Sequence, residues 1–295
     1  MANDPSLLIL AAGMGSRYGG LKQMDGFGPH GETIIDFSIY DAIEAGFKKV
    51  VFVIRKSFAN EFISRMETKW SSKINMDFVF QELDQLPVGF DCPASREKPW
   101  GTGHAVWVAR ESISGPFGVI NADDFYGRDA MRTLYDYLSD GQGFVVVSYQ
   151  LKNTLSTHGS VNRGICQVDE YGYLSKIVER KNIVLDSDGS IYYESEGRRE
   201  NLDPNTKVSM NMWGFRKAYF QQAEIFFRSF LERDLSNPGA EFYIPDLIQY
   251  LIDNQSYQVK VLQSASNWIG VTYKEDKPAV ELAFKELIDK GLYPF

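Results

Sequence analysis

The feature that most constrains this chain lies near its amino terminus, in residues 7–22, which read LLILAAGMGSRYGGLK. Four apolar residues at positions 7–10 are enough for a buried strand. Small residues follow the strand directly, namely Ala11, Ala12, Gly13 and Gly15. A strand that runs into a glycine-rich turn leaves backbone N–H groups pointing at an anion. Arg17 and Lys22 add two cations, so the segment predicts a phosphate-binding loop in an α/β protein.

The spacing of this segment differs from that of two common phosphate-binding loops, G-x-G-x-x-G and G-x-x-x-x-G-K-[ST]. An ordinary glycine-rich turn with a solvated Arg17 and Lys22 is therefore the alternative interpretation. The apolar strand before the glycines and the two cations after them favour phosphate binding, because an uncharged ligand would not need both cations.

Length and charge limit the class of protein. The 295 residues suit one large domain with an ample core, and the net charge of −8 argues against a general nucleic-acid binder. No apolar run approaches the roughly 18 residues of a membrane span, so we expect no membrane partner. The two cysteines and three histidines are scattered, which indicates neither a disulfide framework nor a zinc site. The first residues lack the basic region of a signal peptide, so we expect a cytoplasmic protein.

Apolar periodicity in the first half of the chain alternates between strands and helices. Strands are expected at residues 7–10, 50–54, 78–80, 118–120 and 144–149, and helices at residues 33–45, 58–70, 104–111 and 130–138. This alternation predicts an α/β fold with a doubly wound sheet. Ligands of such sheets bind beyond the carboxyl ends of the strands, where Gln81 and Asp123 are also expected.

The second half has a different pattern. The expected elements are a hairpin at residues 165–168 and 174–178, strands at 208–215 and 257–262, and helices at 218–232, 243–253 and 278–290. The polar stretch at residues 181–207 predicts a long loop or a short ribbon. No hexapeptide repeat is present, so we expect no left-handed β-helix module.

A second polar signal follows the strand expected at residues 118–120, in the order Asn121-Ala122-Asp123-Asp124. A carboxylate at the end of a buried strand that faces a phosphate loop can bind Mg²⁺, which prefers one or two carboxylates together with phosphate oxygens. The alternative is that Asp123 is a cap or a turn residue.

A third signal combines Gln81 with the string GTGHAV at residues 101–106. A glutamine side chain can donate and accept on one face, as the imide edge of a pyrimidine requires, and Gly101 lets the backbone approach a flat base. The alternative, which is compatible with base binding, is a helix capped by Thr102. His104 is expected to have a structural rather than a catalytic role.

The first motif resembles the L-x-A-G-x-G-x-R…K signature of the sugar-1-phosphate nucleotidyltransferases. This resemblance implies a three-layer α/β/α, Rossmann-like nucleotide-diphospho-sugar transferase fold with a mixed, mainly parallel central sheet. It also implies that the loop wraps the triphosphate of an NTP and that Asp123 is the Mg²⁺ ligand. The string GTGHAV resembles the base-reading segment of bacterial uridylyltransferases of the N-acetylglucosamine-1-phosphate and glucose-1-phosphate type. That likeness implies UTP, with Gln81, Gly101 and Thr102 around the uracil.

The resemblance extends to the sugar side. The string KIVERK at residues 176–181 resembles the I-V-E-x-K element of the same uridylyltransferases, and MNMWGF at residues 210–215 resembles their x-N-x-G strand. By this resemblance the sugar and its phosphate are bound by Gly164, Glu179, Lys181 and Asn211. Arg180 competes with Lys181 for the phosphate, and a solvated strand end is the alternative for both.

One position departs from the family pattern. The string WIGVTYKED at residues 268–276 aligns with W-x-D-V-G-T-P-E-D, and Gly270 replaces the aspartate that would be the second metal ligand. Phosphate oxygens and water could complete the coordination of a Mg²⁺ held by Asp123. Further candidates for the missing ligand are Asn267, Thr272 and Asp124.

Together these resemblances imply a single nucleotidyltransferase domain, with the nucleotide in residues 1–150 and the sugar phosphate in residues 151–295. The expected reaction joins an NTP, first of all UTP, to a sugar 1-phosphate and releases pyrophosphate, with Arg17, Lys22 and Asp123 as the catalytic residues. The alternatives are a GT-A-like glycosyltransferase, a non-catalytic nucleotide-binding relative, and a cytidylyltransferase that acts on phosphocholine. The sequence leaves the sugar and the oligomeric state open.

Overall fold

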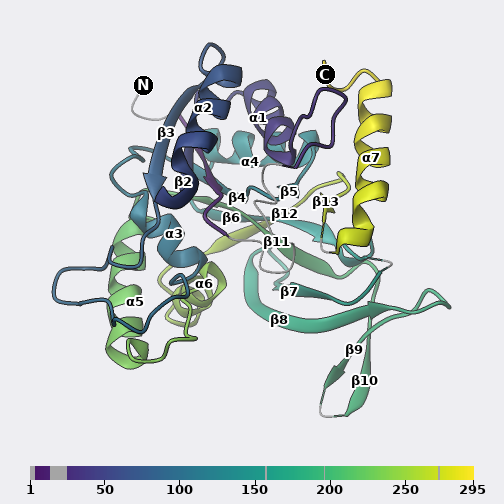
Figure 1. Cartoon of the computed structure of the whole chain (residues 1–295). Coiled ribbons are helices and arrows are strands. Elements are labelled where there is room, and N and C mark those ends of the chain that lie inside the picture. Colours follow the sequence, from purple (N-terminus) through teal and green to yellow (C-terminus); the bar gives the residue numbers. More distant parts are fainter. Residues whose placement is uncertain (1–3, 14–24, 157, 196, 272) are drawn as a thin grey trace.

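The computed structural model describes residues 4–13, 25–156, 158–195, 197–271 and 273–295. Within them a large mixed sheet is covered by helices on both faces, which confirms the expected three-layer α/β fold (Figure 1). None of the described helices is long and apolar enough to cross a membrane.

Four neighbouring strands of the sheet are parallel. They are β4 (Phe117–Asn121), β1 (Ser6–Leu10), β2 (Lys49–Ile54) and β3 (Asn75–Phe80), in this spatial order. In β1 and β2 nearly every side chain is apolar and buried, as expected for parallel strands with helices on both faces. Because the four strands run in the same direction, their carboxyl ends share one edge of the sheet.

Antiparallel strands extend the sheet beyond β4. The strand β11 (Lys207–Phe215) runs antiparallel to β4, to β6 (Phe144–Gln150) and to β7 (Val161–Val168), and β12 (Val259–Gln263) lies parallel to β6. The sheet is therefore mixed with a parallel core, as the sequence predicts.

Two sets of helices cover the sheet (Figure 1). One face carries α1 (Ile34–Ala45), α2 (Ala59–Trp70) and α4 (Arg128–Asp140). The other carries α3 (Thr102–Val108), α5 (Ala218–Asp234) and α6 (Ile244–Asp253). Each set packs apolar side chains onto strand residues and forms a separate core, since successive strand residues point to opposite faces.

The boundaries of α1 follow from its sequence. The backbone N–H of Thr33 donates to Oδ2 of Asp36 at 2.8 Å, and the indole of Trp70 donates to Oδ1 of the same carboxylate at 2.7 Å. The helix ends where Gly46 adopts a left-handed conformation with φ of 118°. Asp36 thereby joins the first turn of α1 to the end of α2.

The polar stretch that follows β7 forms a ribbon. The long strand β8 (Leu174–Leu185) pairs with β7, and β9 (Ile191–Ser195) and β10 (Arg198–Leu202) form a hairpin that extends from the body (Figure 1). The ribbon alternative of the sequence interpretation is therefore correct.

The end of the molecule near the carboxyl terminus is closed by β5 (Asp124–Phe125), β13 (Ile269–Gly270) and α7 (Lys277–Asp289). The remaining elements are the 3₁₀ turns η2 (Lys56–Phe58), η3 (Leu151–Asn153) and η4 (Lys274–Asp276). A third apolar cluster, which includes Phe37, Phe125 and Phe284, joins α1, β5 and α7.

Candidate active site

Several predicted site residues lie at the carboxyl edge of the parallel strands. The backbone N–H of Ala11 donates to the carbonyl oxygen of Val53 at 2.8 Å, and that of Gln81 donates to Ile54 at 2.8 Å. Asp123 follows β4, which pairs in parallel with β1. The start of the predicted phosphate loop, the base-reading glutamine and the acidic residue therefore share one edge.

The described part of the phosphate loop is its first three residues. Ala11 and Ala12 are buried, Gly13 is exposed, and no described atom lies within 4 Å of the place that a Cβ would take at Gly13. The remaining predicted residues of the loop, Gly15, Arg17 and Lys22, lie outside the described residues.

On the base side, a hydrogen-bond network holds Gln81. Its Nε2 lies 3.0 Å from the carbonyl oxygen of Gly101 and 3.2 Å from Nδ1 of His104, and the side chain is almost fully buried. Nε2 of His104 lies 2.8 Å from the carbonyl oxygen of Gln85. Burial lowers the pKa of His104 to about 4, so the ring is neutral at physiological pH, which agrees with the structural role expected for it.

Gly101 and Thr102 have packing roles of their own. Gly101 has φ of 100°, and a Cβ there would lie 2.4 Å from the carbonyl oxygen of Phe242. Thr102 is the first residue of α3 rather than its cap, and its hydroxyl accepts a hydrogen bond from the backbone N–H of Ile244 at 3.2 Å. The interpretation of Thr102 as an N-cap is therefore wrong, because its side chain supports the start of α6 instead.

Asp123 and Asp124 form an acidic pair after β4. Asp124 is connected to Asn211, a predicted sugar-binding residue, through the side-chain amide of Asn121. Nδ2 of Asn121 donates to Oδ2 of Asp124 at 2.8 Å, and Nδ2 of Asn211 donates to Oδ1 of Asn121 at 2.7 Å. Asn211 has φ of 61° and lies where the pairing of β11 with β6 is irregular. The indole of Trp213 donates to Oδ1 of Asn211 at 2.9 Å. The structure thus brings Asn211 beside the acidic pair.

Gly270 lies beside this pair, as the alignment of residues 268–276 implies. In the short ladder of β5 and β13, Gly270 is opposite Asp124. A Cβ on Gly270 would lie 3.1 Å from Oδ1 of Asp124 and 2.3 Å from the ring of Trp268. The space that a second aspartate would need is therefore occupied by the indole.

The donor set still suits Mg²⁺. Among the described residues, no group of three or more His, Cys, Asp and Glu side chains could hold a metal ion. Mg²⁺ does not require such a group, because it is commonly bound by one or two carboxylates together with phosphate oxygens and water. Asp123 and Asp124, at the strand end beside the predicted phosphate loop, fit that pattern. Of the other candidates, Asn267 is exposed and Thr272 lies outside the described residues.

On the sugar side, the structure brings two predicted residues together. Gly164 of β7 is opposite Glu179 of β8. Glu179 is exposed at the surface, yet partial burial raises the pKa of its carboxyl group, and the positive charges of Arg163 and Lys181 oppose the rise. Gly164, Glu179 and Lys181 therefore belong to one region of the β7–β8 ribbon.

Arg163 was missed by the sequence interpretation. Its Nε donates to the carbonyl oxygen of Thr154 at 3.1 Å, and its guanidinium lies 5.0 Å from the ring centre of Trp268. Burial lowers the pKa of Arg163 to about 10, so the side chain remains a cation, close to Asp124 and Glu179. The alternation of β7 could have identified it, because Arg163 shares the inward face with Val161.

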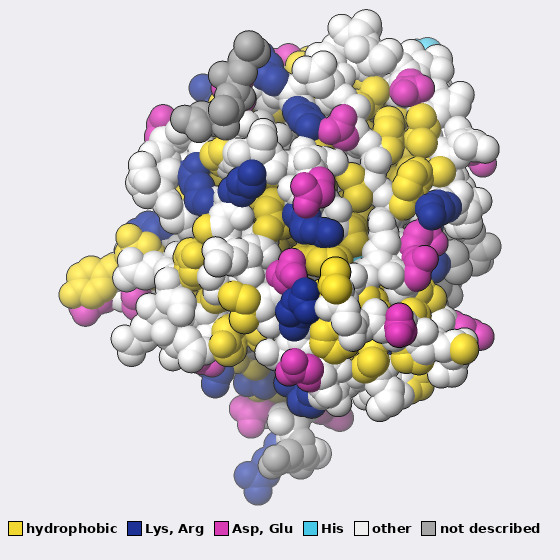
Figure 2. All heavy atoms as spheres, turned by 90° about the vertical axis from the view of Figure 1, so that its left-hand side faces the viewer, with side chains coloured by type: hydrophobic (Ala, Val, Ile, Leu, Met, Phe, Trp, Pro, Cys, Tyr) yellow, Lys and Arg dark blue, Asp and Glu magenta, His cyan; other side chains and the backbone are white. Residues whose placement is uncertain are grey.

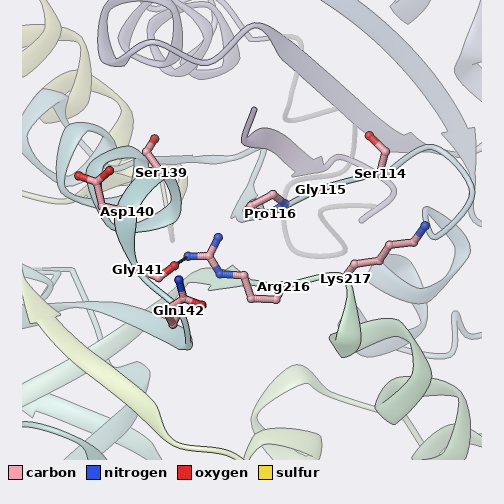
Figure 3. A pocket seen from close by; sticks show the side chains of 9 residues that line it. All are labelled: Ser114, Gly115, Pro116, Ser139, Asp140, Gly141, Gln142, Arg216 and Lys217. Carbon is pink, nitrogen blue, oxygen red and sulfur yellow. Dashed lines mark hydrogen bonds between the residues drawn. The ribbon is translucent and has the colours of Figure 1, made fainter. Parts of the chain in front are cut away.

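A polar cavity of about 350 Å³ lies away from these residues (Figure 3). It is lined by Ser114, Gly115, Pro116, Ser139, Asp140, Gly141, Gln142, Arg216 and Lys217. Most of these residues precede β4 or β6, and Arg216 and Lys217 follow the antiparallel strand β11, so the cavity is at the opposite edge of the sheet from Asp123. Arg216 donates to the carbonyl oxygens of Leu138 and Gly141, which end α4, so its role there is to cap a helix.

On the face shown in Figure 2, acidic and basic side chains are interspersed with apolar ones. A nucleic-acid binding face would concentrate positive charge. On this face the basic side chains are dispersed rather than gathered in one patch.

Comparison with known proteins identifies a family whose model matches part of the chain. A family model described as "Nucleotidyl transferase" matches residues 6–181 of the chain. No curated protein sequence matches the chain. A solved UDP-glucose pyrophosphorylase complexed with UDP-glucose is 15% identical, with a TM-score of 0.61 over 96% of this chain and 98% of that one. The inositol-1-phosphate CTP transferase from T. maritima is 12% identical, with a TM-score of 0.62 over 97% of each chain. At these identities the two solved structures show that the fold is shared.

Proposed function

This chain belongs to the nucleotidyl transferase family, and we propose that it transfers a uridylyl group from UTP to a sugar 1-phosphate, with pyrophosphate as the second product. The observation that carries the proposal is the shared carboxyl edge, where residues 11–13, Gln81 and Asp123 follow neighbouring parallel strands. Such an edge can bind phosphates, base and metal side by side.

The proposed step is a direct displacement. An oxygen of the sugar phosphate attacks the α-phosphorus of the nucleotide in line, and the bond to the β-phosphate oxygen breaks as pyrophosphate leaves. The attacking phosphate is already an anion, so a general base is unnecessary. Catalysis then depends on positioning and on the neutralisation of charge.

We assign the phosphates to the amino-terminal loop. The backbone amides of residues 11–13 and Gly15, with Arg17, hold the β- and γ-phosphates, and Lys22 neutralises charge at the α-phosphate. Asp123 would hold Mg²⁺, which when bound supplies positive charge to the phosphate oxygens. Asp124 lies next to it and has Asn121 as its hydrogen-bond partner.

The uracil is assigned to Gln81, Gly101 and Thr102, and the side chain of Gln81 is hydrogen-bonded to the carbonyl oxygen of Gly101 and to His104. A neighbour that binds UDP-glucose supports a uridine nucleotide. The CTP transferase has the same fold at a comparable TM-score, so the base preference must depend on local contacts rather than on the fold.

The sugar phosphate is assigned to the second half of the chain. Gly164, Glu179 and Asn211 would contact the sugar, and Lys181 its phosphate. In this proposal residues 1–150 bind the nucleotide and residues 151–295 bind the acceptor, within a single domain. The hydrogen bond between Asn211 and Asn121 connects the two halves beside the acidic pair.

A screen of pyrophosphate release tests the proposal. The purified chain is incubated with Mg²⁺, each of ATP, GTP, CTP, UTP and dTTP, and a panel of sugar 1-phosphates. We expect pyrophosphate with UTP and at least one sugar phosphate, together with the matching UDP-sugar. If no combination of nucleotide and sugar phosphate releases pyrophosphate, the proposal is contradicted. Incorporation of labelled pyrophosphate into UTP from a UDP-sugar separates this reaction from glycosyl transfer, which does not exchange pyrophosphate.

A further inference from the structure

We propose that His104 is a positioning residue, which turns the side-chain amide of Gln81 so that its oxygen alone is left to read the nucleobase. The site would then select uracil or thymine over cytosine. The inference rests on the proposed function, in which Gln81 contacts the base, and it names the structural cause of the base preference.

The hydrogen-bond partner of Nε2 determines the tautomer of His104. Its Nε2 lies 2.8 Å from the carbonyl oxygen of Gln85, and a carbonyl oxygen can only accept. Nε2 therefore carries the proton, and in the neutral ring Nδ1 is left as an acceptor. The low pKa of His104, about 4 because of burial, keeps the ring neutral at physiological pH.

The orientation of Gln81 follows from that tautomer. Its amide group faces two acceptors, the carbonyl oxygen of Gly101 at 3.0 Å and Nδ1 of His104 at 3.2 Å. The nitrogen has two protons, one for each acceptor. A flipped amide would place Oε1 against both acceptors, so it would lose two hydrogen bonds and gain two repulsive contacts. The amide nitrogen is thus fully used inside the protein.

The ring of His104 is held in place by its neighbours. The side chain is fully buried, nearly parallel to the ring of Trp107 at 6.0 Å and 5.3 Å from the ring of Phe227. The charged groups that act on its titration, Arg110 and Arg96, both favour the neutral form. The packing and the nearby cations therefore favour one position of the ring and its neutral form.

The oxygen of Gln81 remains for the ligand. Among the described residues, no group donates a hydrogen bond to Oε1 of Gln81. Uracil and thymine present an N3–H donor to such an oxygen, whereas N3 of cytosine is an acceptor and would face it with a second lone pair. The expectation that Gln81 both donates to and accepts from the base is thereby narrowed to acceptance alone.

Two variants and the wild-type protein test this inference. His104→Phe keeps an aromatic ring of similar size but removes the Nδ1 acceptor and the Nε2 donor. His104→Asn restores an acceptor near the position of Nδ1. Binding of UTP and CTP is measured by calorimetry, and kcat/KM for both is measured with the same sugar phosphate. The ratio of UTP to CTP is the readout, since a general loss of structure would lower both values together.

We expect the wild type to favour UTP over CTP at least tenfold. His104→Phe should reduce this ratio by about five- to tenfold, which is the scale of one neutral hydrogen bond. His104→Asn should recover most of the lost preference. The ¹⁵N shifts of the wild-type ring should show the neutral Nε2–H form from pH 5.5 to 8, which tests the tautomer even if a variant does not fold. A protonated ring or an Nδ1–H form would overturn the inference.

The comparison of UTP with CTP can also contradict the inference. Equal use of UTP and CTP by the wild type, or an unchanged ratio in His104→Phe, would overturn the inference and leave the proposed function standing. Absence of both nucleotide binding and turnover with all five NTPs would overturn the proposed function and this inference with it.

Discussion

At Gly101, backbone conformation and packing require the same residue. Its φ of 100° with ψ near 180° belongs to a region that only glycine adopts readily, and a Cβ would meet the carbonyl oxygen of Phe242 at 2.4 Å. Its carbonyl oxygen accepts from Gln81 at 3.0 Å. One residue thus fixes both the start of α3 and the amide that we assign to the base.

We predict that Gly101→Ala lowers the free energy of unfolding by more than about 2 kcal/mol, because backbone strain and a backbone clash add. The matched control is Gly31→Ala, where φ is 81° but no atom of the described residues lies within 4 Å of the added Cβ, so only strain of about 1 kcal/mol is expected. Urea unfolding measures both. Equal losses in the two variants would show that the contact with Phe242 is not costly.

For the acidic pair, we predict that Asp123→Ala lowers kcat by about a hundredfold or more, the scale of one lost electrostatic stabiliser. The loss should be accompanied by a higher Mg²⁺ requirement, measured by titrating the metal at saturating UTP. Asp140→Ala is the control, since Asp140 is exposed at the opposite edge of the sheet. Near-normal turnover of Asp123→Ala would contradict the assignment of Asp123 as the metal ligand.

At the scale of elements, the short ladder of β5 and β13 brings the segment after β12 to the acidic pair. Gly270 is opposite Asp124, and the indole of Trp268, which lies over Arg163, fills the space beside it. The glycine at position 270 and the position of the Trp268 indole are therefore one structural feature. The metal would depend on β4 and β5 and on the nucleotide for its ligands.

A double-mutant cycle tests this coupling. Gly270→Ala should lower the free energy of unfolding by about 1–3 kcal/mol, because its Cβ would overlap the indole of Trp268. In a Trp268→Ala background the same change should cost less than about 0.5 kcal/mol. Chemical denaturation of the four proteins gives the coupling energy. Additive effects would mean that the indole moves aside freely and does not exclude a side chain at position 270.

At the scale of the whole molecule, the carboxyl-terminal segment closes over α1. The hydroxyl of Tyr293 donates to Oδ2 of Asp41 at 2.8 Å, and Arg128 lies 3.4 Å from the same carboxylate. Burial nevertheless raises the pKa of Asp41 to about 6. The charged carboxylate is thus less favourable in the folded chain than in the unfolded one.

Stability should therefore depend on pH through Asp41. The folded protein binds the proton more tightly than the unfolded chain, so this contribution is most favourable below pH 4 and is lost as the pH rises through about 6. A pKa difference of this size corresponds to roughly 3 kcal/mol above pH 6. Asp41→Asn should raise the free energy of unfolding at pH 8 and change it little at pH 4. Lower stability of Asp41→Asn at pH 8 would show that the ion pair with Arg128 outweighs burial.

Much of this architecture could be predicted from the sequence where one physical signal dominates. The strands β1, β2, β4 and β6 are short apolar runs, and α1 begins near Thr33 and ends at Gly46 as its pattern predicts. The hairpin of β9 and β10 could be predicted only as one of two alternatives, because both its faces are largely polar and exposed.

The sequence supplies candidate residues for the site, which remain a prediction, but it does not show their contacts. The roles of Thr102, which supports α6, and of Arg163, which lies under Trp268, depend on partners far away in the chain. The same holds for Gln81, whose amide nitrogen is hydrogen-bonded to the carbonyl oxygen of Gly101 and to Nδ1 of His104. Spacing identifies candidate residues, but only the tertiary structure shows which of their hydrogen-bonding groups remain for a ligand.

The most direct test of the central claim is a crystal structure of the protein grown with UTP and Mg²⁺. We expect the triphosphate to lie against the backbone of residues 11–13, the metal on Asp123 and the uracil N3–H on Oε1 of Gln81. A nucleotide bound elsewhere, for instance in the cavity beside Arg216, or crystals with no nucleotide at millimolar UTP, would contradict this claim.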